Sequence, residues 1–184
     1  MTSRNEDQSG KVPYEVMLAY ALKTIGRRRL TERQLRDKIV EHFTKKIDQE
    51  VVVEDIDKVI EEMRTSKFID DLDFATLFIQ DTMQRRPHGR MWVQMELARK
   101  GVDRDTIADA LGAYAQASSG EEEMNALRDA AQKKWDSLTG REGRGGEILE
   151  PRKRYEKMFR FLVSRGFSTS MVVRVLDEIS GKSV

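Results

Sequence analysis

The chain has 184 residues, of which 39% are hydrophobic and 35% are charged, and its formal net charge is +1. This balance excludes a bulk polycation, so any basic surface has to be a local patch. Cysteine is absent, which excludes disulfides and thiolate metal sites and is typical of a reducing compartment. We expect a cytoplasmic protein, because no apolar run approaches the roughly 20 residues of a membrane-spanning helix and the N-terminus lacks the apolar segment of a signal peptide.

Helical periodicity begins after residues 1–12, a polar tail that we expect to be disordered. Pro13 suits the first turn of a helix, where its missing N–H costs nothing. Thr31 and Gln34 have the spacing of a capping box, which predicts the start of a second helix. The apolar residues of three predicted helices recur at the spacing of a buried helical face: Leu18, Ala21, Leu22 and Ile25, then Leu35 and Ile39, then Ile56, Val59, Ile60 and Met63. These segments define a first module, residues 13–68.

Two more three-helix modules follow, at residues 69–117 and 118–184, and the last contains a glycine-rich loop at roughly residues 139–150. Their helices are indicated by apolar residues at helical spacing: Phe74, Leu77 and Phe78; Val93 and Leu97; Ile107, Ala110, Leu111 and Tyr114; Leu127, Ala130, Ala131 and Trp135; Met158 and Leu162; Val172, Val175, Leu176 and Ile179. The sequence therefore predicts an all-α fold of three tandem three-helix modules of helix-turn-helix type.

The modules repeat one another in sequence. Aligning their third helices pairs Ile56 with Ile107 and then with Val172, and aligning the second helices of the first two modules pairs Leu35 with Val93. The two alignments of the first module differ in offset, which places seven extra residues near residues 44–50. The three valines at 51–53 have no partner strand in the sequence, so we interpret them as a loop or the lead-in to a helix. Repetition of this kind indicates a surface built from similar modules.

Gly101 and Gly166 lie at equivalent places between the second and third helices of the last two modules. Each follows a helix and precedes an apolar residue, a pattern typical of a helix end in which glycine is left-handed. Asp103 and Ser168 are then placed to cap the next helix. The first module has Phe43 instead of this glycine, so we expect its turn to differ.

Cations gather at several places along the chain: Arg27, Arg28 and Arg29; Arg85, Arg86 and Arg90; Arg99 and Lys100; Arg152, Lys153, Arg154, Lys157, Arg160 and Arg165. A charge cluster is usually a solvated face. Cations beside a helix–turn–helix can also lie against phosphates or meet acidic patches on a protein partner. The residues alone leave both alternatives open, and we take these cations as candidate faces for a partner or DNA.

The sequence offers no catalytic constellation. We interpret Asp70, Asp71 and Asp73, which precede a helix, as caps and partners of the helix dipole. His42 and His88 have no partner at metal-ligand spacing, and no nucleophile motif accompanies them. The glycine-rich stretch at 140–146 lacks the ending of a phosphate-binding loop, so we interpret it as a flexible linker. We therefore predict a protein that is not an enzyme and has no metal or cofactor.

One predicted helix of the second module is apolar on more than one face, because Met91, Trp92 and Met95 lie beside Val93. Trp92 does not lie on the face of the helix formed by Val93 and Leu97, which we expect to face the core. Packing between modules, which repeat proteins require, and an anchor for a partner are the two alternatives. We favour packing.

Four segments in order resemble the RecX family of bacterial recombination regulators, and the resemblance covers residues 14–180. The segments are Ala21-Leu22 through Arg28 with Thr31-x-x-Gln34-Leu35; Phe68-Ile69-Asp70-Asp71-x-x-Phe74-Ala75; Gly89, Glu96-Leu97 and Lys100-Gly101-Val102; and Phe161-Leu162-x-x-Arg165-Gly166-Phe167. The seven extra residues and the glycine-rich loop depart from the family's pattern. The resemblance therefore indicates the partner better than the geometry of contact.

The resemblance implies three tandem modules in an elongated, curved arrangement. It also implies a protein that binds the RecA–DNA filament, lies along its groove and limits strand exchange, ATP hydrolysis and co-protease action. Such proteins are not enzymes, and some bind single- or double-stranded DNA directly. We expect a monomeric RecA regulator that acts in recombination, DNA repair and the SOS response. The alternative is a helix-turn-helix regulator that acts directly on DNA, for which Arg104 is the obvious base-reading residue.

Overall fold

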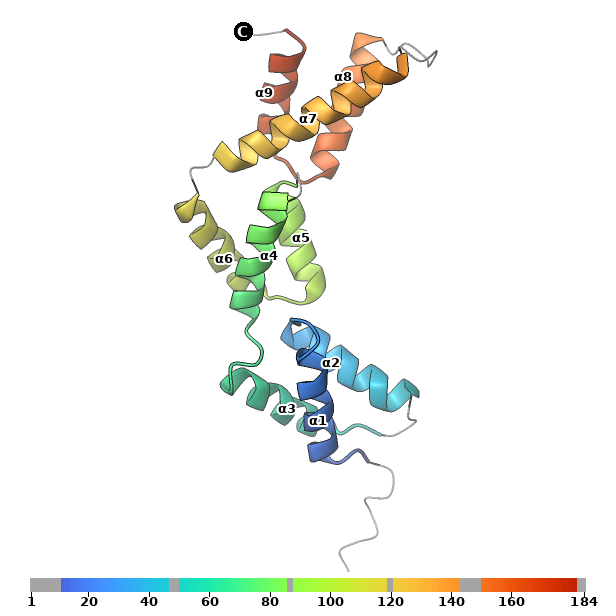
Figure 1. The fold of residues 1–184 in the computed structure, drawn as a ribbon, viewed down its shortest axis with the longest axis vertical. Coiled ribbons are helices and arrows are strands. Elements are labelled where there is room, and N and C mark those ends of the chain that lie inside the picture. Colours follow the sequence, from blue (N-terminus) through green and yellow to red (C-terminus); the bar gives the residue numbers. More distant parts are fainter. Residues whose placement is uncertain (1–10, 47–49, 86–87, 119–120, 143–149, 182–184) are drawn as a thin grey trace, which may run out of the picture. The chain divides into compact units, whose positions relative to one another are not determined.

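A computed structural model describes residues 11–46, 50–85, 88–118, 121–142 and 150–181. Over these ranges the chain forms nine α-helices and one short π-helix, so the all-α repeat fold is confirmed (Figure 1). The α-helices are α1 (Tyr14–Ile25), α2 (Glu32–Val40), α3 (Val53–Thr65), α4 (Asp71–Arg85), α5 (Arg90–Lys100), α6 (Arg104–Ala117), α7 (Glu121–Glu142), α8 (Pro151–Ser164) and α9 (Thr169–Ile179). None of the helices in the described ranges combines the length and the apolar character that crossing a membrane requires.

We call the three predicted sets of helices module 1 (α1–α3), module 2 (α4–α6) and module 3 (α7–α9). The chain also divides into two compact units, Met1–Phe74 with Arg99–Thr106, and Ala75–Ala98 with Ile107–Val184. Module 1 lies in the first unit and module 3 in the second, while module 2 contributes to both. The first unit therefore includes the start of α4 and the α5–α6 turn, because these segments pack on module 1. The exact limits of the three predicted modules stay a prediction.

Module 1 is built on a buried core from all three of its helices, including Met17, Leu35, Ile39, Val59 and Met63. The predicted capping box is confirmed, since the Thr31 side chain accepts a hydrogen bond from the Gln34 backbone and the Gln34 side chain accepts one from the Thr31 backbone. The valines at 51–53 lead into α3, as predicted. The Val12 N–H donates to the carbonyl of Glu50 at 3.0 Å and ties the start of α1 to this lead-in.

The turn after α2 differs from its counterparts in modules 2 and 3, as the missing glycine predicts. The π-helix η1 (Glu41–Lys46) continues α2 and buries Phe43 in the core. A π-helix inserts extra backbone into a helical turn, which agrees with the extra residues of this module. Tyr20 stacks on His42 with ring centroids 4.1 Å apart.

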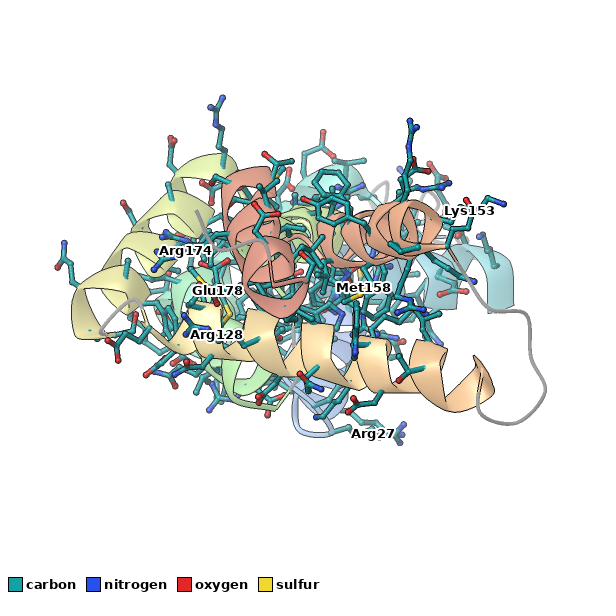
Figure 2. All side chains as sticks on the ribbon, turned by 90° about the horizontal axis from the view of Figure 1, so that it is seen from above. Arg27, Arg128, Lys153, Met158, Arg174 and Glu178 are labelled. Atoms are coloured by element: carbon teal, nitrogen blue, oxygen red, sulfur yellow. The ribbon has the colours of Figure 1, made fainter. Side chains whose placement is uncertain are left out.

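Module 3 has a second core that includes Leu127, Met158, Leu162 and Phe167. Glu178 of α9 pairs with Arg128 of α7 and Arg174 of its own helix, each at 3.4 Å, and Figure 2 shows the three side chains together. The glycine-rich loop begins later than predicted, because α7 continues through residues 139–142. The Thr139 hydroxyl donates to the Trp135 carbonyl at 3.1 Å and follows the helical path. Residues 143–149 of that loop lie outside the described ranges.

Candidate partner-binding site

Modules 1 and 2 meet at a contact that we call the first joint, formed by residues 31–33 on one side and by Asp71, Lys100 and Gly101 on the other. The Thr31 hydroxyl donates to the Lys100 carbonyl at 2.6 Å, and the Glu32 N–H donates to the Asp71 carboxylate at 2.9 Å. Both donors lie at the N-terminus of α2, where backbone N–H groups lack helical partners. Thr31 therefore caps its own helix and binds the next module.

Modules 2 and 3 meet at a second joint of the same design, entirely within the second compact unit. The Gly89 N–H donates to the Arg165 carbonyl at 2.9 Å, and the Met91 N–H donates to the Gly166 carbonyl at 3.2 Å. The Arg90 N–H donates to the Glu123 carboxylate at 2.9 Å. The start of α5 thus receives the α8–α9 turn and an acid from the first turn of α7.

The two joints correspond position by position. The alignment of the second helices pairs Thr31 with Gly89 and Glu32 with Arg90, and the alignment of the last two modules pairs the turn at Gly101 with the turn at Gly166. In each joint the first N–H of a second helix binds a carboxylate of the next module's first helix. The same helix start also binds the carbonyl before the turn glycine. The repeat seen in the sequence is therefore also a repeat of the contact between modules.

The turn glycines have the left-handed conformation predicted for them, with φ of 93° at Gly101 and 81° at Gly166. They are also required for close approach, which sequence reasoning missed. A Cβ atom on Gly166 would lie 2.2 Å from the backbone nitrogen of Trp92, and one on Gly101 would lie 2.3 Å from the Arg33 side chain. Gly89 has the same role from the other side, since its Cβ would lie 2.3 Å from the Gly166 carbonyl oxygen.

The three acids before α4 have three different structural roles. Asp70 accepts hydrogen bonds from the N–H groups of Leu72 and Asp73, both at 3.0 Å, as the capping interpretation predicts. Asp71 lies in the first joint, and burial raises its pKa although the Glu32 N–H lowers it in part. Asp73 pairs with Arg29. Among the described residues, no group of three or more His, Cys, Asp or Glu side chains is arranged to hold a metal ion.

Packing between modules accounts for Trp92, which lies against Gly166 in the second joint. Its ring also lies 3.9 Å from that of His88, measured between centroids. Packing does not account for Met91 and Met95, whose exposed fractions are 58% and 68%. The two methionines are one helical turn apart and form a small apolar strip on the surface of α5.

The six predicted cations of module 3 divide into two groups. Four are exposed to solvent: Arg152, Lys153, Lys157 and Arg160. Lys153 points outward from the helix, whereas Met158 lies inside module 3 (Figure 2). Glu156 lies 3.3 Å from Arg152 and 3.8 Å from Arg160. Exposed pairs of this kind contribute little to stability and are easily exchanged, so the face remains a cationic surface.

The two other predicted cations of module 3 lie over aromatic rings. The Arg154 guanidinium is 5.1 Å from the centre of Trp135, and that of Arg165 is 5.0 Å from the centre of Phe161. The ammonium group of Lys134, which sequence reasoning did not single out, lies 4.9 Å from the centre of the same Phe161 ring. Arginine and lysine are attracted to the negative faces of such rings. Arg154 and Arg165 therefore have a structural role besides any contact with a partner.

The cations of module 2 are spread over several environments. Arg99 is exposed, while Lys100 is half-buried and contributes its carbonyl to the first joint. The Arg90 side chain lies within 3.4 Å of the Leu111 carbonyl, and its backbone belongs to the second joint. The side chain of Arg85 and the whole of Arg86 lie outside the described residues.

The cations of module 1 surround a hollow of about 490 Å³ between α1 and α2. The described residues that line it include Lys23, Arg27, Arg28, Lys38 and His42, and none of them is acidic. Sequence reasoning identified the two arginines but missed the other cations, because they are separated along the chain and meet only when α1 packs on α2. Arg29 lies apart, paired with Asp73.

Module 3 also has a cavity of about 800 Å³, which we call the module 3 groove. Trp135, Tyr155, Met158, Leu176 and Ile179 form its apolar lining, and Arg152 and Arg154 lie at the end nearest the start of α8. Burial and the nearby Asp177 carboxylate raise the pKa of Tyr155. No sequence pattern indicated this groove, because its residues come from three helices.

Comparison with known proteins identifies the family. A model of the second three-helix domain of RecX matches residues 70–111, and a model of its third three-helix domain matches residues 121–176. A protein of Prosthecochloris aestuarii named regulatory protein RecX is 32% identical over 126 residues, which cover 68% of this chain and 73% of that protein. The chain belongs to the RecX family. The resemblance stated from four sequence segments is confirmed.

Other relatives and two solved structures agree with this family. Regulatory protein RecX of Clostridium acetobutylicum is 30% identical over 160 residues, or 86% of this chain, and that of Clostridium tetani is 31% identical over 159. The chain spans 66% and 65% of the length of these two relatives. The crystal structure of RecX from Lactobacillus salivarius has a TM-score of 0.69 at 19% identity, over 91% of this chain and 96% of that one. A second crystal structure, of regulatory protein RecX, also has a TM-score of 0.69, at 21% identity. These two structures share the fold.

Proposed function

We propose that this chain binds the RecA–DNA filament and modulates, mainly by inhibition, the recombinase, ATPase and co-protease activities of RecA. Membership of a family of regulatory proteins supports the partner. The observation that carries the proposal is the exposed cationic surface of α8, formed by Arg152, Lys153, Lys157 and Arg160. A nucleoprotein filament presents both phosphates and acidic protein surface, and both attract such a face.

The basic hollow of module 1 is the second part of the proposed contact. Its lysines and arginines come from α1, from the turn after α1 and from α2, with no acid among the described lining residues. Concave cationic surfaces concentrate the electrostatic field and favour the approach of anionic partners. We propose that the chain acts as a binding protein and not as an enzyme, with cationic areas on more than one module.

Direct reading of DNA by a helix-turn-helix is the alternative, and the joints disfavour it. A reading head needs its turn and the following helix start free to enter the major groove. The α5–α6 turn is instead packed at Gly101 against Arg33, and the α8–α9 turn at Gly166 against Trp92. A footprint on defined DNA without RecA would support the alternative. Binding that is steeply salt-dependent and indifferent to sequence would count against it.

The test mixes the chain with RecA, single-stranded DNA and ATP and measures ATP hydrolysis and co-sedimentation with filaments. Reversal of Arg152, Arg154 and Arg160 together is a poor probe of the surface, because Arg154 stacks on Trp135 and its loss would disturb packing. Lys153→Glu, Lys157→Glu and Arg160→Glu together alter only exposed side chains. This variant should weaken filament binding at least tenfold, which corresponds to about 1.4 kcal/mol.

The matched control is Lys45→Glu, Lys58→Glu and Lys133→Glu together, which makes the same change in net charge at three exposed lysines elsewhere. It should bind within about twofold of the unaltered chain, because local charge and not total charge determines the contact. Equal loss in both variants would contradict the assignment to α8. Unchanged ATP hydrolysis and no co-sedimentation of the unaltered chain, across a wide titration, would refute the proposed function.

A further inference from the structure

The module 3 groove lies where modules 1 and 2 each receive the next module. Module 1 presents Glu32, Arg33 and Ile60 at the first joint. The alignment of the modules carries these positions to Arg90, Met91 and Leu111 in module 2, and then to Tyr155, Glu156 and Leu176 in module 3. All of the last three line the module 3 groove. The groove is therefore the last copy of a docking surface that is occupied twice within the chain.

The two occupied copies show what this surface accepts. Each receives a turn followed by a helix, together with a carboxylate from the first turn of a neighbouring helix, Asp71 in one case and Glu123 in the other. In both, the carboxylate accepts a hydrogen bond from the first N–H of the receiving helix. An acidic helix start is thus the feature common to both occupants.

Module 3 differs from the earlier modules at the point where this carboxylate would bind. Its second helix is extended by one turn at the start and begins with Pro151, which has no N–H to donate. Arg152 and Arg154 line the same end of the groove. Arginine binds carboxylates through charge-assisted hydrogen bonds, so side chains here can replace the backbone donor of the first two joints. The ion pair of Arg152 with Glu156 is exposed and weak enough to be exchanged.

From this repetition we infer that the module 3 groove binds a helix of the RecA protein that begins with an acidic residue. The inference rests on the proposed function, because it takes RecA in the filament as the partner. The apolar lining of Trp135, Tyr155 and Ile179 receives the apolar residues of that helix, and Arg152 pairs with its acidic first turn. Burial of aromatic and arginine anchors of this kind dominates many protein interfaces.

A second copy of the chain is a poor occupant of the groove. A head-to-tail contact would have to place the turn between α2 and α3 of one copy in the module 3 groove of the next copy. This turn is the one equivalent to the turns at Gly101 and Gly166. That turn is the π-helix η1, with the bulky Phe43 in the core and no glycine for close approach. Open head-to-tail association would also generate filaments of the chain itself, and the altered turn disfavours them.

The first experiment obstructs the groove without changing its charge. Ser180, an exposed residue at the end of α9, lines the groove, so Ser180→Trp places a large ring at its edge. We expect co-sedimentation with RecA–DNA filaments to weaken at least tenfold. Ser170→Trp, at an exposed position near the other end of α9 that does not line the groove, should bind within about twofold of the unaltered chain. Binding by Ser180→Trp as tight as that of the unaltered chain would overturn the inference and leave the proposed function intact.

The second experiment identifies the occupant directly and does not depend on the folding of the tryptophan variant. The chain has no cysteine, so Ser180→Cys can be labelled at one site with a benzophenone maleimide and irradiated on RecA filaments. Cross-links to RecA at a segment where a helix begins with Asp or Glu are expected. Cross-links to DNA alone or to a second copy of the chain, or none while the chain sediments with filaments, would overturn the inference. If the unaltered chain does not bind filaments at all, the proposed function is refuted and the inference with it.

Discussion

Replacement of Gly166 by alanine tests whether the α8–α9 turn is a joint or only a helix end. The left-handed backbone alone makes any L side chain cost roughly 1–2 kcal/mol there. The added Cβ would also lie 2.2 Å from the Trp92 nitrogen and 2.5 Å from the Trp92 Cβ, so the α5 start has to move away. That movement breaks the two backbone hydrogen bonds from Gly89 and Met91, each worth about 0.5–1.5 kcal/mol. We expect a total loss of about 2–5 kcal/mol.

Gly181 provides the matched control. It is also left-handed, with φ of 69°, but among the described residues no atom beyond its chain neighbours lies within 4 Å of its Cβ position. Gly181→Ala should therefore cost at most about 1–2 kcal/mol, from the backbone conformation alone. Denaturant unfolding compares the two variants, and amide hydrogen exchange at Gly89 and Met91 reports whether the joint opens. If Gly166→Ala and Gly181→Ala lower the free energy of unfolding equally, and exchange at Gly89 and Met91 is unchanged, the α8–α9 turn is not a joint between modules.

Three further predictions concern single residues. Lys67 has φ of 59°, which is unfavourable for any residue with a side chain, so Lys67→Gly should raise the free energy of unfolding by about 0.5–1 kcal/mol. Denaturant unfolding that shows no such increase would contradict this prediction. Burial raises the pKa of Asp71 above its ordinary value of 3.8. The contribution of Asp71 to the free energy of unfolding is therefore greatest below pH 3.8 and falls as pH rises through the folded-state pKa. Asp71→Asn should be at least as stable as the unaltered chain at pH 7 and lose that advantage below about pH 4. The pKa shift of Asp103 has the opposite direction, because hydrogen bonds from Thr106 hold this pKa below its ordinary value. Asp103→Ala should lower the free energy of unfolding by about 1 kcal/mol at pH 7. That loss should shrink as unfolding is measured at increasingly acid pH.

The helices and their caps could be predicted from the sequence because they depend on local patterns. The capping box at Thr31, the left-handed Gly166 and the cap at Ser168 each involve residues within a few positions of one another. The late end of α7 could not be predicted in this way, because the glycine at 140 indicates a break, whereas the helix of Leu138 and Thr139 continues through it. One glycine weakens a helix by only about 1 kcal/mol, and packing can outweigh that.

The joints could not be predicted, although their sequence signal was present. Gly89, Gly101 and Gly166 are each visible in the sequence, but the requirement for close approach depends on a backbone or side chain from another module. Likewise the position of Asp71 fits a helix cap, and only the structure brings it to the Glu32 N–H. The alignment of the second helices already pairs the two helix starts that bind the next module, at Glu32 and at Arg90. A search for residues at equivalent helix starts could have suggested a repeated contact.

The cationic candidates show the same limit of sequence reasoning. Adjacent cations such as Lys153 and Arg154 look alike in the sequence, but one is exposed and the other lies over Trp135. Their difference follows from the helical period, which turns neighbouring residues to different faces. The hollow at Arg27 and Lys38 depends on the packing of α1 against α2, which no single segment encodes.

Electron microscopy of RecA–DNA filaments, with and without a saturating amount of the chain, shows whether the chain binds the filament. We expect added density along filaments that carry the unaltered chain. We expect much less density with the variant in which Lys153, Lys157 and Arg160 are replaced by glutamate. Filaments that look the same with and without the unaltered chain, in density and in length, would contradict the proposed binding.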